Sequence, residues 1–591
     1  MVLVSAIVIA VAFLFGRSGA VQGMTTLLLF ALLAFLTALS IMWSIAPELT
    51  YVETGRTLAY FALFGASVAA ARLVPRAAPA LLQAIAIGAV MPVAYGLASR
   101  VWPAELAANE VSNRLGQPFD YWNAVGCVAA MAVPALLWLG SRRTGHPTAR
   151  LLAYPALGIC VLAILLTQSR GAAAAAVVAA AGWFLFAPLR LRSLPVLLIP
   201  GIAGSGVGAW ALSKDPFTKA YQPLAAKEAL AAEFGGWVLL MIVVLLVAGA
   251  VVNAALARRA PSERLRRRVG IVAIAVALLI PLAAFTSVAF SERGIGQRID
   301  ELTSETEVSP EESGGRVFDA SSSRGKYWRE AFRVFDARPL EGVGAGAFAI
   351  GRLRHRTDAS VTRHAHGWIP QTMADLGLLG LIVTTLLFLA WVIAALSATG
   401  LLPRRLERAP GQTEPGPRRD WDGDRIALVA LGLIPVAFGV QSLLDWTWFI
   451  PAPAAMALIP AGYLAGRGAL GRELPGRGSP NPRRIAAAVA TVATGLLLAW
   501  GIWLPEASDR ATNEALELSD QKRFDEAIDD FIDALRDYAE DWNDRLHAVP
   551  NHAHNRSLAE LVELSDDDQL REWLVGHPDA ATDAARALVH T

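Results

Sequence analysis

The sequence predicts an all-α protein that crosses a membrane many times. Three observations lead to this fold class: 54% of the 591 residues are hydrophobic, only 17% are charged, and long apolar runs recur along the chain. A spanning helix needs roughly 20 apolar residues, more than most buried helices of soluble proteins contain. Mean hydropathy is +0.44, so we expect membrane lipids as partners. The net charge of +1 is not informative about nucleic acid, which we do not expect as a partner.

Apolar runs of spanning length can be followed from one end of the chain to the other, and we expect about 12 to 14 transmembrane helices. The runs lie at 2–16, 24–42, 56–71, 78–98, 121–139, 151–168, 171–188, 194–212, 235–257, 269–290, 371–397, 425–444, 448–466 and 485–504. We interpret the first as a short span rather than a signal peptide, because it lacks a basic start and a small-residue cleavage site. Cys127 and Cys160 lie inside apolar runs, which excludes a disulfide framework and a thiolate metal cage.

Basic connectors alternate with less basic ones. The basic ones are 72–76, 141–150, 189–192, 258–268, 403–425 and 467–484. Short loops rich in Lys and Arg stay in the cytoplasm. The sequence therefore predicts that the remaining segments lie outside, namely 43–55, 99–120, 213–234, 291–370 and 505–591.

The longest loop between predicted spans is 291–370, and loops of this length are usually functional or disordered. Its part at 299–315 is acidic and poor in apolar residues, which predicts flexibility. After it we expect an amphipathic helix that starts at Arg324, is capped by Ser323 and lies along the membrane surface. Its apolar stripe would consist of Trp328, Ala331, Phe332 and Phe335, with Pro339 following the helix.

The polar tail at 505–591 predicts a small helical appendage outside the membrane. Ala515, Ala527, Phe531 and Ala534 fall at the small and aromatic positions of one tetratricopeptide-like helix pair. One such repeat is too few to be stable alone. We therefore predict two units: a transmembrane domain at 1–504 that carries the loop 291–370, and a tail at 505–591 that is a candidate docking site for a protein partner.

Short landmarks follow one another along the membrane part. They are WSIAPELTYVETGR (43–56), RLGQPFDYWNAVG (114–126), TQSRGA (167–172), SRGKYWREAF (323–332), PLEGVGAGAF (339–348), HAHGWIPQTMADLGLLG (364–380) and SLLDWTWFIP (442–451). In this order they resemble the O-antigen ligase and polymerase superfamily of bacterial lipid-linked glycan transferases. Two positions depart from the family pattern: Gly367 stands where Asn or Ser is common, and Asp375 stands where Glu is usual.

The resemblance implies an enzyme of the glycosyltransferase-C type in the bacterial cytoplasmic membrane. Such an enzyme transfers a glycan from a polyprenyl (undecaprenyl) diphosphate carrier to a hydroxyl of a glycan, lipid or protein acceptor at the outer face. It needs no metal and no nucleotide cofactor. The resemblance thus predicts a role in cell-envelope polysaccharide biosynthesis.

The family's paired diphosphate-binding arginines align with Arg170 and Arg324. Residue chemistry agrees independently, because a diphosphate leaving group gains negative charge as the glycosidic bond breaks. A guanidinium binds phosphate oxygens through two hydrogen bonds and stays charged beside lipid. Structural alternatives remain: Arg170 as a helix-end residue that reaches the interface, and Arg324 as a solvated helix residue. Arg316 is a reserve candidate.

His366 is the candidate base, and the family's key histidine aligns with it. An acceptor hydroxyl is a poor nucleophile until a base takes its proton, and histidine titrates in the suitable range. His364 is a second choice for binding or orienting the acceptor. The two histidines could also be metal ligands, but no further cluster with ligand spacing accompanies them. Surface histidines without a role are the other alternative.

Further residues are candidates for binding the substrate. Gly344 and Gly346 lie in a run that lacks the Lys-Ser/Thr of a phosphate-binding loop, so a tight turn that approaches the headgroup is expected. Trp328 is expected on the surface helix. Asn123 and Asp445 are polar residues at outer helix ends; they either line the same site or act as helix caps, and the same two readings apply to Glu53 and Arg56.

Ligase, polymerase and protein O-oligosaccharyltransferase differ only in the acceptor, and the sequence does not separate them. A transporter or flippase for lipid or polysaccharide is an alternative from another class. Against it, the chain has no inverted hydropathy repeat and no charge in the middle of a span, both of which transporters often show. A binding protein without turnover is a third possibility.

Overall fold

The computed structural model describes residues 1–108, 110–258, 324–356, 362–402, 421–470 and 476–520, and short stretches between 262 and 275. Within these ranges the chain is helical, and the pairing of Arg17 with Arg477 is an isolated bridge rather than a strand. The predicted all-α class is therefore confirmed.

The helices follow the predicted apolar runs in order, and every run except 269–290, which falls mostly outside the described residues, coincides with a helix. The bounds of the first half are α1 (Val2–Phe15), α2 (Met24–Leu39), η1 (Ser40–Trp43), α3 (Pro47–Leu73), α4 (Ala78–Val101), α5 (Pro103–Leu106), α6 (Trp122–Ser141), α7 (Pro147–Thr167), α8 (Arg170–Phe186), α9 (Arg190–Ala211), α10 (Asp215–Thr218) and α11 (Leu224–Arg258). Those of the second half are α14 (Arg324–Ala337), α15 (Phe348–Gly351), η2 (Arg352–Arg354), α16 (Trp368–Thr399), α17 (Gly423–Leu444), η3 (Thr447–Phe449), α18 (Pro451–Arg467) and α19 (Pro482–Asp520).

Length and hydropathy identify nine helices in the described ranges that are suited to cross a membrane, including α6, α7, α16 and α17. Helices α1 and α8 are apolar but shorter. The chain is thus a multi-pass membrane protein, as expected. The residues predicted as the tail begin inside α19, which runs without a break across the expected boundary at 504/505. Residues 521–591 lie outside the described residues, so the appendage and its repeat remain a prediction.

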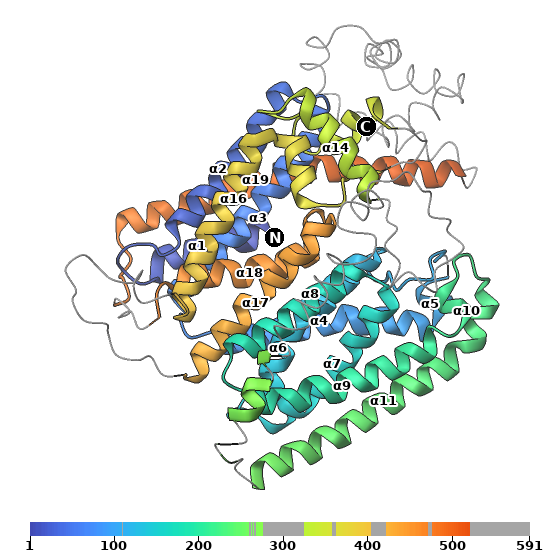
Figure 1. Cartoon of the computed structure of the whole chain (residues 1–591). Coiled ribbons are helices and arrows are strands. Elements are labelled where there is room, and N and C mark those ends of the chain that lie inside the picture. Colours follow the sequence, from blue (N-terminus) through green and yellow to red (C-terminus); the bar gives the residue numbers. More distant parts are fainter. Residues whose placement is uncertain are drawn as a thin grey trace.

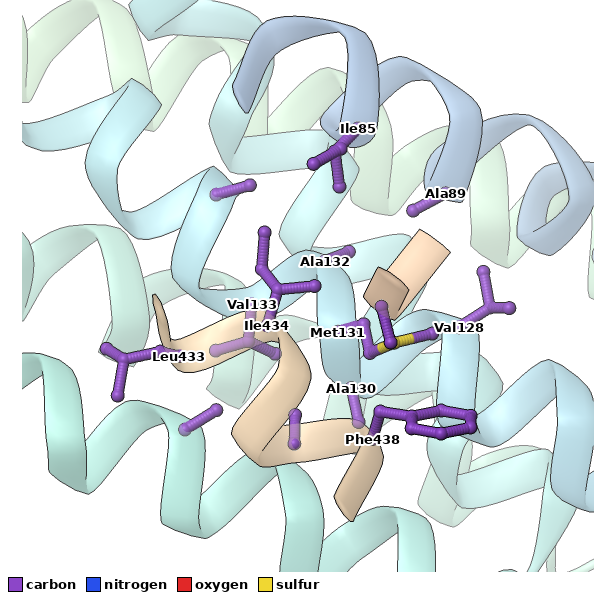
Figure 2. Packing of buried hydrophobic residues seen from close by; sticks show 14 of the residues in the cluster. Ile85, Ala89, Val128, Ala130, Met131, Ala132, Val133, Leu433, Ile434 and Phe438 are labelled. Carbon is purple, nitrogen blue, oxygen red and sulfur yellow. The ribbon is translucent and has the colours of Figure 1, made fainter. Parts of the chain in front are cut away.

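The helices form two groups that meet at α17 (Figure 1). One group holds α4, α6, α7, α8, α9 and α11, and the other holds α1, α2, α3, α16, α18 and α19. Helix α6 lies at the centre of the first group, where nearly all of its residues are buried. Figure 2 shows Met131 and Val133 of α6 packed between Ile85 of α4 and Ile434 of α17. Because α17 also contacts α16 and α18, it joins both groups.

The loops predicted on opposite sides of the membrane gather at opposite ends of the bundle. At one end Arg72 donates to the carbonyl of Arg17, and Tyr463 accepts from Ala77. At the other end, which we call the site end, contacts join the segments 43–50, 99–108, 110–122, 213–227, 324–356, 362–367 and 445–449. The predicted alternation of loops therefore agrees with the fold. Which end faces the cytoplasm remains a prediction.

Helix α16 is interrupted at Gly377, whose φ of 61° and ψ of −155° are not helical. Backbone groups released by such a break must find partners, because lipid offers none. The segment 339–344 supplies them. Its bonds to α16 run from Leu378 N to Pro339 O (2.9 Å), Leu379 N to Leu340 O (3.2 Å), Val343 N to Ala374 O (3.0 Å) and Gly344 N to Asp375 O (2.9 Å). This pairing fixes the loop after α14 on the spanning helix.

Helix α14 begins at Arg324 and ends before Pro339, as predicted. Of its expected apolar stripe, Ala331 is buried and Phe332 is 42% exposed, and the contact of the stripe with the membrane surface remains a prediction. Glu330 is buried next to Ala331 because it forms an ion pair of 2.6 Å with Arg352, which is buried as well. The expected Ser323 cap lies outside the described residues.

Candidate functional site

Asp445, directly after α17, is the centre of the polar contacts at the site end. Its carboxylate is buried and accepts hydrogen bonds from Tyr121 Oη (2.6 Å), Gln441 Nε2 (3.3 Å) and its neighbour Trp446 N (2.9 Å). The Nδ1 atom of His366 lies 3.3 Å from Asp445 Oδ1. Three segments that are far apart in the sequence, those of Tyr121, His366 and Asp445 itself, therefore meet at one carboxylate.

Electrostatics keep this carboxylate ionised. Burial alone would raise the pKa of Asp445, but hydrogen bonding to His366, the charge of Arg324 and the hydroxyl of Tyr121 together hold the pKa below its ordinary value. The pKa of Tyr121 is raised well above its ordinary value, mainly by burial and then by the negative charge of Asp445. Tyr121 is therefore a hydrogen-bond donor, and Asp445 is an anion in front of His366.

His366 is held by its backbone as well as by its ring. Its φ of 52° is rare for a residue with a side chain, so surrounding contacts must maintain it. Trp328 Nε1 donates to the carbonyl of His366 at 3.0 Å, and the ring of Tyr327 stacks on the imidazole at 5.5 Å between centroids. With Nδ1 toward Asp445, the proton belongs on Nδ1 and the lone pair on Nε2. The side chain is 24% exposed, so a ligand can approach it.

A buried network joins the segment 362–367, which carries both histidines, to α16. Gln371 Oε1 accepts from the amide of Ala365 at 2.7 Å, and Gln371 Nε2 donates to Asp375 Oδ2 at 2.8 Å. The other oxygen of Asp375 accepts from the amide of Phe348 at 3.0 Å. Asp375 thus connects the segment 362–367, through Gln371, to the glycine-rich turn at 342–348.

The glycine-rich run forms a turn, in agreement with the expectation. Gly344 and Gly346 have φ values of 105° and 74°, which a residue with a side chain rarely adopts. A Cβ on Gly344 would lie 2.2 Å from Ser44 Oγ, and one on Gly346 would lie 2.6 Å from Glu53 Cγ. The glycines therefore allow close approach to the neighbouring chain. Their contact with substrate remains a prediction.

Arg170 begins α8 directly after Ser169, whose hydroxyl caps the helix at Ala172 N (3.3 Å). The next residue, Gly171, lies against Gln441: a Cβ there would be 2.5 Å from Gln441 Oε1. Because Gln441 also binds Asp445, Arg170 begins its helix beside the Asp445 cluster. The side chain of Arg170 is partly exposed at this end of α8.

The other predicted arginine, Arg324, begins α14, and its charge acts on both Asp445 and Tyr121. Asn123 belongs to the same cluster, because its Nδ2 donates to Tyr121 Oη at 2.9 Å. The structure therefore brings four predicted site residues together. His366 and Arg324 act on Asp445, and Asn123 is linked to Asp445 through Tyr121. Trp328 contacts His366 through the backbone carbonyl, and its contact with substrate remains a prediction.

His364 lies in an aromatic stack next to this cluster. Its ring packs on Phe449 at 4.1 Å and on Trp446 at 4.9 Å between centroids. Burial, followed by the positive charge of Arg56, lowers the pKa of His364 to about 3, so the imidazole is neutral at physiological pH. Its Nδ1 atom is buried and has no hydrogen-bond partner among the described residues. The guanidinium of Arg56 lies over the ring of Phe449, 5.2 Å from its centroid, and forms an ion pair with Glu53.

Among the described residues, no group of three or more His, Cys, Asp and Glu side chains is close enough to hold a metal ion. Both cysteines are free and buried. Among the described residues, His366 lies 3.3 Å from the carboxylate of Asp445, whereas His364 stacks on the ring of Phe449.

The sequence-based reasoning missed Tyr121, Gln441, Trp446 and Gln371. Tyr121 and Trp446 stand inside the quoted landmarks 114–126 and 442–451, so their position beside Asn123 and Asp445 was an available signal. Gln441 and Gln371 are polar residues near the ends of apolar helices, where an amide is costly unless it has partners. That cost could have identified them as part of a polar network.

The central part of the chain resembles a known family. Residues 229–385 match the model of the family described as O-antigen ligase. This stretch includes Arg324, His364 and His366. No curated protein matches the chain. The match supports assignment to the O-antigen ligase and polymerase superfamily, and with it a role in joining cell-envelope glycans through glycosyltransferase-like activity on a lipid-linked donor and a glycan acceptor.

Proposed function

Taking residues 229–385 as an O-antigen ligase segment, we propose that the protein transfers a glycan from a polyprenyl diphosphate carrier to an acceptor hydroxyl. The reaction takes place at the outer face of the bacterial cytoplasmic membrane. One observation carries the proposal: the carboxylate of Asp445 has His366 3.3 Å away and lies within the field of Arg324. A base and a cation that act around one buried anion match what glycosyl transfer from a diphosphate requires.

His366 acts on the acceptor. With the Nδ1 proton directed to Asp445, Nε2 accepts the proton of the acceptor hydroxyl as its oxygen attacks the anomeric carbon. The imidazolium that forms is stabilised by the adjacent carboxylate. Because this carboxylate stays ionised, it need not lose a proton before it can perform this role.

Arg170 and Arg324 act on the donor. The bond between the anomeric carbon and the diphosphate oxygen breaks, and its electron pair moves to the leaving group. Guanidinium groups stabilise this developing charge through paired hydrogen bonds, and such groups are most effective where water is excluded. The family resemblance implies attack with inversion at the anomeric carbon.

The orientation of the chain supports an outer active site. The short loops at the end opposite to the site, and the helix ends beside them, carry Arg72, Arg142, Arg190, Arg467 and Arg484. Basic loops stay in the cytoplasm. The site end therefore belongs to the outer face, where lipid-linked glycans are joined to their acceptors in this family.

The proposal is tested with purified protein in lipid nanodiscs, a polyprenyl diphosphate oligosaccharide, candidate acceptors and EDTA. We expect glycan transfer by the native chain and its loss in Arg170→Ala, Arg324→Ala and His366→Ala. Arg333→Ala is the matched control, because Arg333 lies on the same helix as Arg324 and is exposed. Transfer that survives in the three variants would overturn the residue roles. Lipid movement without bond cleavage would identify a transporter instead.

A further inference from the structure

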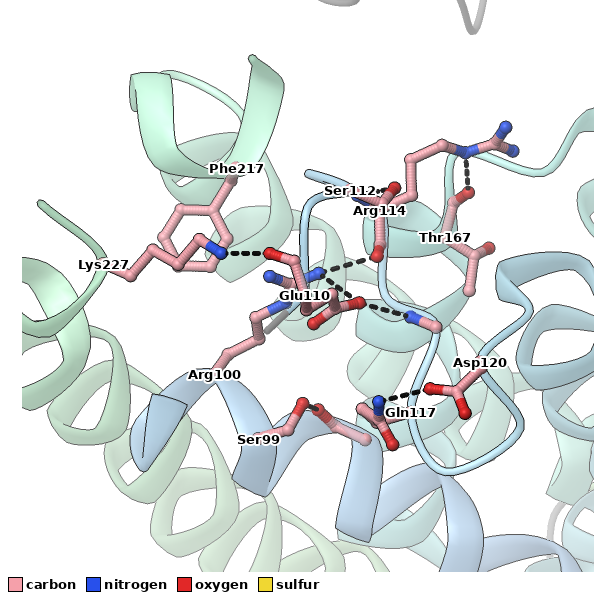
Figure 3. Close-up of polar contacts among 12 residues, drawn as sticks. Ser99, Arg100, Glu110, Ser112, Arg114, Gln117, Asp120, Thr167, Phe217 and Lys227 are labelled. Atoms are coloured by element: carbon pink, nitrogen blue, oxygen red, sulfur yellow. Dashed lines mark hydrogen bonds and ion pairs between the residues drawn. The ribbon is translucent and has the colours of Figure 1, made fainter. Parts of the chain in front are cut away.

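The loop before α6 is fastened to its surroundings by a set of charged side chains (Figure 3). Arg100 Nη2 donates to the carbonyl of Arg114 at 2.6 Å and to Glu110 Oε1 at 3.3 Å. Glu110 accepts from the amide of Gly116 at 3.4 Å, and Lys227 of α11 donates to the carbonyl of Glu110. Charges buried at this depth persist only when they are paired and hydrogen-bonded. The network therefore fixes the backbone on both sides of Arg114.

The side chain of Arg114 reaches from this loop to the turn that precedes Arg170. Its Nε donates to Thr167 O at 2.8 Å and its Nη2 donates to Gln168 O at 3.1 Å. Carbonyls at the end of a helix have no partner within the helix. At the end of α7, those of Thr167 and Gln168 accept from Arg114, and that of Leu166 accepts from the amide of Leu115. Gln168 adopts a left-handed φ of 49°, a conformation that must be held by its contacts.

The same guanidinium also touches the start of α6. It lies over the ring of Trp122, 4.4 Å from the centroid. Trp122 is next to Tyr121, and the two rings are 5.5 Å apart. Since Tyr121 donates to Asp445, Arg114 lies between two parts of the site: the turn that carries Arg170 and the residues that orient the base.

We propose that Arg114 is a positioning residue that sets the place of the donor-binding Arg170 relative to the Tyr121 and Asp445 pair. The inference rests on the proposed function and deepens it, since Arg114 acts on the diphosphate through Arg170. Only arginine suits the role, because two carbonyls and an aromatic face must be met at once by a planar, charged group. Lysine keeps the charge but offers neither the two fixed donors nor the flat face.

The test compares Arg114→Lys and Arg114→Gln with Arg143→Gln, a control at the opposite end whose side chain is exposed. We expect Arg114→Lys to lower kcat/KM for the lipid donor about tenfold, because a displaced Arg170 both binds the diphosphate and stabilises its developing charge less well, while the KM for the acceptor and the thermal midpoint stay near native values. Arg114→Gln should lower kcat/KM further. Because Arg170→Ala is expected to lose transfer, the double variant is compared by its affinity for farnesyl diphosphate: Arg114→Lys should add no further loss to that of Arg170→Ala, because its effect passes through Arg170. A native kcat/KM for the donor in Arg114→Lys, or full additivity of the two losses of affinity, would overturn the inference.

A second measurement separates this inference from the proposed function. Binding of farnesyl diphosphate to the full chain in nanodiscs is measured without an acceptor. If the native chain transfers no glycan, the proposed reaction fails, but a roughly tenfold weaker diphosphate affinity in Arg114→Lys and none in Arg143→Gln still supports the positioning role. Equal affinity in the native chain and Arg114→Lys, or no diphosphate binding by the native chain, contradicts it. Where Arg114→Gln does not fold, the Lys variant decides.

Discussion

Replacing Asp445 with asparagine tests the role assigned to the buried carboxylate, because the change removes the charge and keeps the shape. The native side chain accepts from Tyr121, Trp446 and His366 at Oδ1 and from Gln441 at Oδ2. An asparagine oxygen can replace Oδ1. Its amide nitrogen would face the Nε2 of Gln441, but the Oε1 of Gln441 has no hydrogen-bond partner among the described residues. A rotation of that amide restores the lost bond.

The fold should therefore tolerate Asp445→Asn better than it tolerates Asp445→Ala. We expect the asparagine variant to lose no more than about 1 kcal/mol of unfolding free energy, the net worth of one hydrogen bond. The alanine variant leaves several donors without a partner, and each costs about 1–3 kcal/mol. The difference between the two variants isolates the charge from the packing.

Catalysis should respond to the charge. A hydrogen bond to a charged group contributes about 1.5–3 kcal/mol, and about 1.4 kcal/mol corresponds to a tenfold rate change. Asp445→Asn is thus expected to lower kcat by about 10- to 100-fold, because the imidazolium of His366 loses its counter-charge. The KM for the lipid donor should change less. Tyr121→Phe removes one neutral donor and should cost less than Asp445→Asn.

The assay is steady-state transfer from a labelled polyprenyl diphosphate oligosaccharide, together with the thermal midpoint of each variant in nanodiscs. Arg333→Ala provides the baseline for a surface change at the same end. A native kcat in Asp445→Asn at an unchanged midpoint would refute the idea that this carboxylate supports His366. Equal instability of the asparagine and alanine variants would show that the charge serves the fold.

Three further predictions follow from the same contacts. The pKa of His364 is lowered to about 3 in the folded chain, whereas it is near 6.5 in the unfolded chain. Between these two pH values only the unfolded chain takes up a proton at this imidazole. The free energy of unfolding therefore falls as the pH drops from 6.5 toward 3, by at most about 1.4 kcal/mol per pH unit. His364→Phe should flatten the thermal midpoint measured between pH 7.5 and 5; parallel curves for the two proteins would contradict this. Gly342→Ala should lower the midpoint markedly, because φ is 71° and the new Cβ would lie 2.4 Å from Asp375 O; a native midpoint would count against the turn described. Gln371→Ala should cost about 1–3 kcal/mol in urea unfolding, because it removes the buried partner of Ala365 N, and should also lower the transfer rate; a loss of stability without loss of rate would separate the network from His366.

The candidate residues of the site were in part predictable, because they occur in short landmarks with a fixed order. Arg170, Arg324 and His366 are predicted from these motifs, and in the fold both Arg324 and His366 act on the carboxylate of Asp445. Their catalytic roles remain predictions. Glu330 shows what a local pattern does not predict: a charged residue outside the apolar stripe of its helix is nevertheless buried, because it pairs with Arg352.

The sequence by itself determined the helical class, the course of the spans and the alternation of the loops, since each depends on the composition of a continuous stretch about 20 residues long. Only the tertiary structure decided which polar groups meet. Tyr121 and Asp445 are separated by 324 positions, and Gly377 breaks α16 where the segment 339–344 can replace its lost bonds. Such partnerships depend on how whole helices pack against one another, and no local pattern of residues encodes the distance between two helix ends.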